Sequence, residues 1–234
     1  MKCLKLSRVD HYGRPVDGLT DLFRATFHSL EKLSLNDCFY LDTFKSINFK
    51  NIQVLNLSNA QVGFIRPLQF FQYICKSKKL TQLNLSDVNI LEDWAKRGDY
   101  ITWIDYLVMN LPVTMEKFSI RGNLGYYLKD NHVEVLVKRC KQLTELDLSG
   151  IKITNKSLSN IIDESRELVK LDISGKENGI TKIMELKSMP KLKVLNISEK
   201  HLESHAQKEN LTRKLPHLTI NHDLDFNIAD PEDW

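Results

Sequence analysis

The sequence predicts an α/β fold in which about nine strand–helix repeats stack into a solenoid. Three observations predict it. The pattern L-x-x-L-x-L returns along the whole chain, apolar and polar residues alternate within each copy, and the apolar spacing between copies becomes helical. Such a unit buries its apolar stripe only against its neighbours, so we expect a parallel sheet on the concave face and helices on the convex face.

Nine copies of the pattern can be aligned, with steps of 22 to 35 residues between their first positions. The copies are Met1-Leu4-Leu6, Leu30-Leu33-Leu35, Ile52-Leu55-Leu57, Leu80-Leu83-Leu85, Met115-Phe118-Ile120, Leu143-Leu146-Leu148, Leu168-Leu171-Ile173, Leu192-Leu195-Ile197 and Leu215-Leu218-Ile220. The fourth and sixth positions alternate with polar residues, which indicates a short strand with one buried face. This is the pattern of a leucine-rich-repeat horseshoe.

Helical spacing between the copies predicts helices over residues 68–75, 101–111 and 131–142. In the last of these, Asn131 and Glu134 predict a capping box at the helix start. The step after Leu30 leaves little room for a helix, and the longest step contains an insertion from Leu91 to Asp99.

Composition is typical of a soluble globular chain, with 42% hydrophobic and 27% charged residues among 234. No apolar run approaches the ~20 residues of a membrane helix, so we expect an intracellular protein, cytoplasmic or nuclear. The four cysteines form no Cys-x-x-Cys and are expected to be buried thiols.

The repeat around Cys140 resembles a known family. The stretch from Arg139 to Gly150, RCKQLTELDLSG, is similar to the cysteine-containing repeats of F-box leucine-rich-repeat proteins, the substrate receptors of SCF ubiquitin ligases. The last repeats are similar to the S-phase-kinase-associated type, so the resemblance covers residues 74–221. Residues 171–175, LDISG, are also similar to the ZYG-type receptors of cullin complexes. An F-box is absent, because neither Leu-Pro pair, Leu111-Pro112 or Leu215-Pro216, begins the Leu-Pro-x-Glu motif.

The resemblance implies that a protein partner binds the concave sheet face. The third, fifth and seventh positions of each copy would form this face. Small polar residues there also fit a crowded inner surface without any partner, and the alternative for the charged residues of both signs on adjacent strands is that they pair with one another. The candidate partner-binding residues are Lys32, Asn56, Asn84, Lys117, Arg121, Glu145, Asp147, Lys170, Asp172 and Asn196. The fifth-position residues are expected to be exposed, so that Asn84→Ala and Asp172→Ala would leave stability nearly unchanged.

The chain divides into the repeats, residues 1–220, and an acidic tail, residues 221–234. The tail holds five acids and no Lys or Arg, which leaves 33 basic and 25 acidic residues elsewhere. The resemblance implies a tail that folds back on the concave face, with Phe226 and Trp234 packing there. A loose tail is the alternative.

No catalytic or metal-binding pattern is found, so we expect neither an enzyme nor a cofactor. The seven histidines are scattered, and His201 with His205 is the one i, i+4 pair. Lys76-Ser77-Lys78-Lys79 is explained by cations at a helix end, so no nucleic-acid partner is expected.

The sequence therefore predicts a non-enzymatic recognition solenoid, most like the substrate-binding part of a ubiquitin-ligase receptor. A cullin-ligase assembly would be reached through a missing or separate N-terminal part, which would also cover the strand-like segment from Met1 to Leu6. The alternatives are an assembly or structural subunit of an intracellular complex, and a GTPase-activating horseshoe using Arg8 or Arg121.

Overall fold

The computed structural model describes residues 2–7, 29–38, 47–62, 65–90, 100–175, 179–198, 205–216 and 218–221. The predicted insertion from Leu91 to Asp99 lies outside these residues, as do Arg8, Phe226 and Trp234. No helix of the described part is long and apolar enough to cross a membrane.

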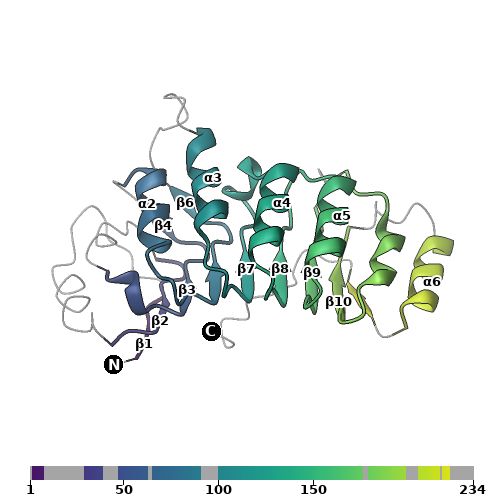
Figure 1. Cartoon of the computed structure of the whole chain (residues 1–234), viewed down its shortest axis with the longest axis horizontal. Helices are drawn as coiled ribbons and strands as arrows, with labels where there is room; N and C mark the ends of the chain where they lie inside the picture. The colour runs from purple at the N-terminus through teal and green to yellow at the C-terminus, as the bar shows by residue number, and fades with distance from the viewer. Residues whose placement is uncertain are drawn as a thin grey trace.

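Short strands form one parallel sheet in the described part of the chain (Figure 1), and their order in the sheet follows their order in the sequence. The strands are β1 (Cys3–Lys5), β2 (Lys32–Ser34), β3 (Val54–Asn56), β5 (Gln82–Asn84), β7 (Lys117–Ser119), β8 (Glu145–Asp147), β9 (Lys170–Asp172), β10 (Val194–Asn196) and β11 (Thr219–Asn221). Two shorter strands, β4 (Gln61–Val62) and β6 (Asn89–Ile90), pair separately. Because parallel neighbours need a crossover, the chain returns through a helix or turn between strands.

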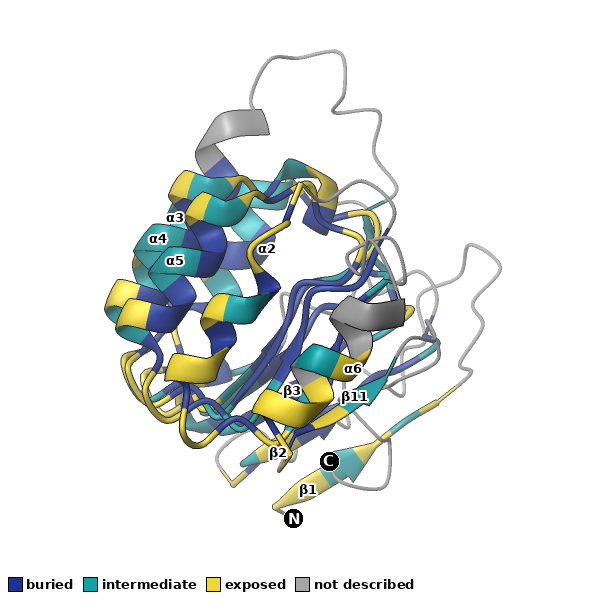
Figure 2. Cartoon of the chain, turned by 90° about the vertical axis from the view of Figure 1, so that its right-hand side faces the viewer, coloured by how far each residue is buried: buried dark blue, intermediate teal, exposed yellow. Residues whose placement is uncertain are grey.

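Helices form a second layer on one side of the sheet. They are α2 (Pro67–Ile74), α3 (Tyr100–Asn110), α4 (Asp130–Arg139), α5 (Asn155–Glu164) and α6 (His205–Lys214), with the 3-10 helices η2 (Phe49–Asn51), η4 (Gly125–Tyr127) and η5 (Ile183–Ser188). Figure 2 shows α2 to α5 beside one another, with buried residues facing the strands. The predicted helices over 68–75, 101–111 and 131–142 are confirmed.

Apolar residues of the L-x-x-L-x-L copies form the core between the two layers. Leu55, Leu83, Leu146, Leu171 and Leu195 are fully buried fourth positions. They occupy equivalent places on neighbouring strands. The α/β repeat fold is therefore confirmed by the register of the strands.

The last strand departs from the predicted register. The copy ending in Leu218 and Ile220 would place Leu218 opposite Leu195, but Ile220 pairs with Leu195 and Asn221 with Asn196. A shift of two residues keeps every side chain on the same face, so the apolar alternation does not distinguish the two registers. The side chain of Asn221 donates a hydrogen bond to Oδ1 of Asn196, 3.1 Å away, which favours the observed one.

A left-handed residue follows the strands at a constant position, two residues after the sixth. Asp37, Asn59 and Asp87 hold this place in the N-terminal repeats, and Gly122, Gly150 and Gly175 hold it further along, all with positive φ. Asn, Asp and Gly are the residues that adopt this conformation at least cost.

The predicted capping box at 131–142 is wrong in its residues. Helix α4 begins at Asp130 after Lys129, and Nδ1 of His132 accepts the Lys129 backbone N–H at 2.9 Å. Histidine thus takes the role predicted for Glu134. Its imidazole reaches back over the same three residues as a Glu or Gln would.

Candidate functional site

Three charged residues lie side by side at the third position of neighbouring strands. Lys117 on β7, Glu145 on β8 and Lys170 on β9 are in register. Oε1 of Glu145 lies 3.1 Å from Nζ of Lys117 and 3.4 Å from Nζ of Lys170. The lysine side chains remain 24% and 29% exposed, whereas that of Glu145 is 10% exposed. We call these three residues the charged triad.

One oxygen of the triad has no partner among the described residues. Oε2 of Glu145 is buried and accepts no hydrogen bond from them, while Oε1 is shared by two ammonium groups. A buried carboxylate oxygen without a donor is energetically costly. The triad is therefore an unsaturated acceptor flanked by two partly exposed cations.

The fifth-position residues that were candidates for partner binding are not exposed, contrary to the prediction. The structure buries all five of the candidates in this column, which are Asn56, Asn84, Asp147, Asp172 and Asn196. Their partner-binding role stays a prediction. The physical reason for their burial is that they bond to the turn that follows each strand and to one another.

The turn bonds repeat from strand to strand. Oδ1 of Asn56, Asn84, Asp147 and Asp172 each accepts the backbone N–H two residues later, at 2.9 to 3.0 Å. This is an Asx-turn, which Asn and Asp form and most other residues do not. We call the fifth-position column the polar ladder.

Bonds between strands extend the polar ladder. Oδ2 of Asp147 accepts the Ser119 hydroxyl at 2.7 Å, and Oδ2 of Asp172 accepts the Asn196 amide at 2.9 Å. The carboxylates of Asp147 and Asp172 are register partners without a donor described between them. Burial, and next the Asp147 charge, raise the pKa of Asp172 to about 6.

The remaining predicted residues lie apart from the triad. Lys32 is exposed on β2. Nε of Arg121 lies 3.1 Å from Oδ2 of Asp87. A Cβ at Gly122 would meet Oδ1 of Asp87 at 2.1 Å, so any other residue there would displace the Asp87 carboxylate of this ion pair.

Cys75, Cys140 and His132 offer no exposed nucleophile or base. Cys75 and Cys140 are buried, and burial raises the pKa of each thiol to about 12, whereas Cys3 is exposed, contrary to the prediction. Nε2 of His132 lies 3.1 Å from Oδ1 of Asp105, so both ring nitrogens are engaged. Burial lowers the pKa of His132, against the opposing effect of Asp105. Among the described residues, no three His, Cys, Asp or Glu side chains gather as metal ligands.

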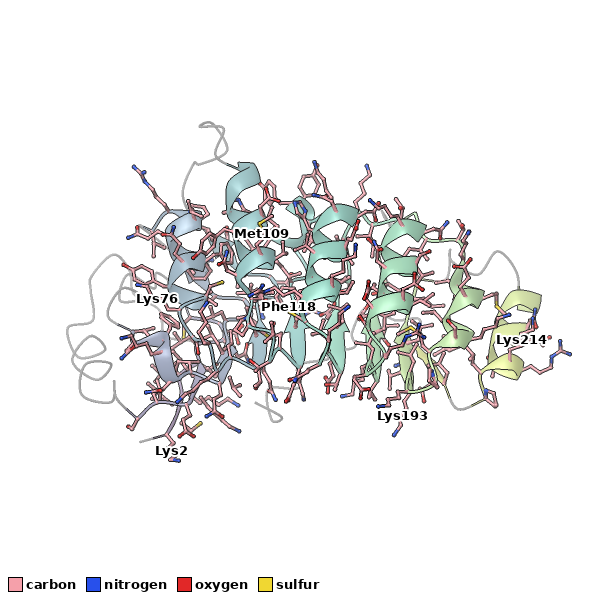
Figure 3. The ribbon with its side chains drawn as sticks, viewed as in Figure 1. Lys2, Lys76, Met109, Phe118, Lys193 and Lys214 are labelled. Carbon is pink, nitrogen blue, oxygen red and sulfur yellow. The ribbon has the colours of Figure 1, made fainter. Side chains whose placement is uncertain are left out.

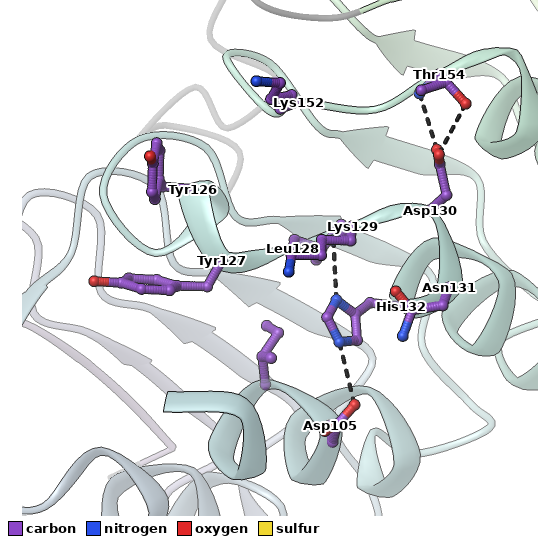
Figure 4. A pocket seen from close by; sticks show the side chains of 11 residues that line it. Asp105, Tyr126, Tyr127, Leu128, Lys129, Asp130, Asn131, His132, Lys152 and Thr154 are labelled. Carbon is purple, nitrogen blue, oxygen red and sulfur yellow. Dashed lines mark hydrogen bonds and ion pairs between the residues drawn. The ribbon is translucent and has the colours of Figure 1, made fainter. Parts of the chain in front are cut away.

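A pocket of about 820 Å³ lies between α3, η4 and the start of α4 (Figure 4). Tyr126, Tyr127, Lys129 and Lys152 lie around it, with His132 and Asp105. The sequence patterns missed this pocket because its residues belong to none of the repeat columns. The signal was the adjacent pair Tyr126-Tyr127, which fits no core period, within the loop between a strand and a helix.

Comparisons with known proteins add little to this geometry. No protein-family model matches the chain, and no curated protein matches it. Among solved structures it is similar to internalin C2 from Listeria monocytogenes, at 18% sequence identity and a TM-score of 0.46, over 88% of this chain and 80% of that one.

Proposed function

We propose that this chain is a non-enzymatic protein-recognition module whose partner binds the sheet face at the charged triad. The observation that carries the proposal is the pair of partly exposed lysines, Lys117 and Lys170, which share one oxygen of a single carboxylate, that of Glu145. Because two cations face one anion here, a partner that brings an acidic group to the lysines would complete their ion pairs.

The rest of the described chain supports recognition rather than catalysis. The parallel sheet holds the triad on three strands in one register, so a partner meets a preorganised surface with little ordering cost. The thiols of Cys75 and Cys140 are buried and His132 is occupied at both nitrogens, which leaves these groups unsuited to nucleophilic or acid–base chemistry.

The finer form of the proposal is the substrate-binding part of a ubiquitin-ligase receptor, built as a horseshoe of about nine repeats in the cytoplasm or nucleus. Its support is the resemblance of residues 74–221, above all the RCKQLTELDLSG repeat, to F-box receptors. Folding of the tail over the sheet, with Phe226 and Trp234 as anchors, belongs to this form of the proposal.

Affinity capture with matched variants tests the proposal. The test variant is Lys117→Gln with Lys170→Gln, which removes both triad cations but keeps side chains of similar reach. The control is Lys193→Gln with Lys214→Gln, two exposed lysines that point away from the body of the chain (Figure 3). Circular dichroism and thermal unfolding establish that both variants fold.

We expect wild type and control to recover the same proteins from cells that express the chain, and the triad variant to lose them. Equal recovery by the two variants would remove the triad from the proposal. Recovered cullin-complex subunits support the ligase form, whereas a stable unrelated complex favours a structural subunit and a GTPase favours a GTPase-activating role.

A further inference from the structure

The pocket beside η4 presents an aromatic surface at the outside of the molecule. Tyr126 is 70% exposed, although its side chain is a large aromatic ring. Its ring packs edge to face on Tyr127, with centroids 5.8 Å apart, and Tyr127 packs edge to face on the buried Trp103 at 5.5 Å. The exposed ring is therefore supported by the core, as aromatic anchors of binding sites are.

The two carboxylates that line the pocket, those of Asp105 and Asp130, form hydrogen bonds within the protein. Oδ1 of Asp130 accepts the Thr154 N–H and the Ser157 hydroxyl, and Oδ2 accepts the Thr154 hydroxyl. Burial opposes ionisation of Asp130, but these hydrogen bonds outweigh it and lower its pKa. Asp105 is engaged with His132. Both acids thus serve contacts within the protein.

The two lysines of the pocket have no such partners. Lys129 and Lys152 are exposed, and neither makes an ion pair with another described residue. In Figure 4 the side chain of Lys152 lies on the Tyr126 side of the pocket, away from the His132 and Asp105 pair. The groups that the pocket leaves available to a ligand are therefore the two ammonium groups, because the oxygens of its two acids already accept hydrogen bonds within the protein.

We propose that this pocket binds an acidic peptide segment of a partner protein, with an aromatic or aliphatic side chain on Tyr126 and Tyr127 and carboxylates at Lys129 and Lys152. The volume of about 820 Å³ is in the range that holds a few side chains. Among the described residues that line the pocket, two are tyrosines and two are lysines without an ion-pair partner, which suits a short amphipathic peptide better than a phosphate backbone. This pocket and the charged triad are separate, so failure of either proposal leaves the other standing.

Titration of the full-length ¹⁵N-labelled chain with the peptide Ac-Glu-Asp-Phe-Glu-Asp-amide tests the proposal. We expect amide shifts confined to residues 124–132 and 152–154, saturating at micromolar to millimolar peptide and weakening with salt. Two matched peptides, one with Gln and Asn for the acids and one with Ala for Phe, should each bind several-fold more weakly.

Two double variants make the site assignment specific. Lys129→Glu with Lys152→Glu should weaken binding by about tenfold or more, because it replaces two attractions with repulsions. The control, Lys193→Glu with Lys214→Glu, makes the same change in net charge elsewhere and should change affinity less than about twofold. Tyr126→Ser should weaken binding without altering the fold, since its ring is mostly exposed.

Several results would overturn the proposal. These are the absence of shifts at millimolar peptide, equal weakening by the pocket and control variants, or equal binding of the neutral peptide. Tighter binding of a single-stranded oligonucleotide at the same amides would replace the acidic peptide with a nucleic acid.

Discussion

Two pairs of strands along the polar ladder, β3 with β5 and β8 with β9, build the same turn with different residues. On β3 and β5 the fifth position is Asn56 or Asn84, and the left-handed position after the strand is Asn59 or Asp87. On β8 and β9 the fifth position is Asp147 or Asp172, and the left-handed position is Gly150 or Gly175. In both regions, Oδ1 of the fifth-position residue accepts a hydrogen bond from the backbone N–H two residues later.

The turn geometry therefore selects Asn or Asp at the fifth position, but it does not select between the neutral and the charged side chain. An Asn carbonyl and an Asp carboxylate accept the same N–H, but only the carboxylates place two buried negative charges on adjacent strands. Those charges lie next to the charged triad, at the centre of the face that we assign to a partner. The Asn residues stabilise the turn without placing a charge in the sheet, whereas the Asp residues do so at the energetic cost of two buried carboxylates on adjacent strands.

The largest loss of stability is expected from substitutions in the apolar core, which is alike in the two regions. Leu55→Ala and Leu146→Ala both empty fully buried fourth positions. Each should lower the free energy of unfolding by about 2 to 5 kcal/mol through cavity formation. Chemical denaturation measures this loss. A cost below about 0.5 kcal/mol at either residue would contradict the shared register.

A second substitution tests the neutral region of the polar ladder. Asn84→Ala removes the acceptor of the buried Ser86 N–H, so it should cost about 1 to 3 kcal/mol and not be neutral as an exposed residue would be. The matched control is Lys32→Ala, an exposed residue of the same sheet. If both variants unfold at the wild-type denaturant concentration, the polar ladder does not stabilise the turn.

In the acidic region, a substitution in the polar ladder should raise the free energy of unfolding instead of lowering it. Asp172→Asn gives β9 the residue that β3 and β5 already carry, and the amides of Asn196 and Asn221 can rotate to keep the ladder bonded. Because burial, and next the Asp147 charge, disfavour the ionised form of Asp172 in the fold, the variant should be about 1 to 3 kcal/mol more stable at neutral pH.

The pH dependence of that gain has a definite sign. Between about pH 4 and pH 6 the folded state holds a proton on Asp172 that the unfolded state has lost, so the contribution of this group to stability falls as pH rises. The advantage of Asp172→Asn should therefore be complete above pH 6 and vanish below about pH 4. Unfolding free energies of both proteins across this range give the curve, and a constant difference would contradict the buried acid pair.

The smallest effects concern the left-handed position. Gly150→Asn should cost less than about 1 kcal/mol, because Asn59 adopts the same conformation and no atom lies within 4 Å of a Cβ at Gly150. Gly175→Asn should cost more, since its Cβ would lie 2.7 Å from the Gly150 backbone. Equal costs at the two glycines would show that close approach plays no role in this turn.

The sequence was sufficient to predict the strands of the L-x-x-L-x-L copies, the helices over 68–75, 101–111 and 131–142, and the face of the sheet on which each leucine lies. Apolar periodicity predicts these features because it follows directly from which side chains are buried. It failed at Leu218, where a shift of two residues leaves that periodicity unchanged. It also failed for Asn84 and Asp172, because alternation places a side chain on the sheet face without telling whether neighbours cover it. The pocket at Tyr126 depends on three segments that meet only in the folded chain.

On the sheet face, a partly exposed column of charged residues lies beside the buried polar ladder, in which Asp147 and Asp172 are register partners on adjacent strands. NMR titration of the side-chain carboxyl carbon of Asp172 tests this arrangement. We expect a midpoint near pH 6 that falls in the Asp147→Asn variant, because one cause of the raised pKa is removed. A midpoint near the usual value of about 4 that Asp147→Asn does not change would show that the two carboxyl groups are not buried side by side.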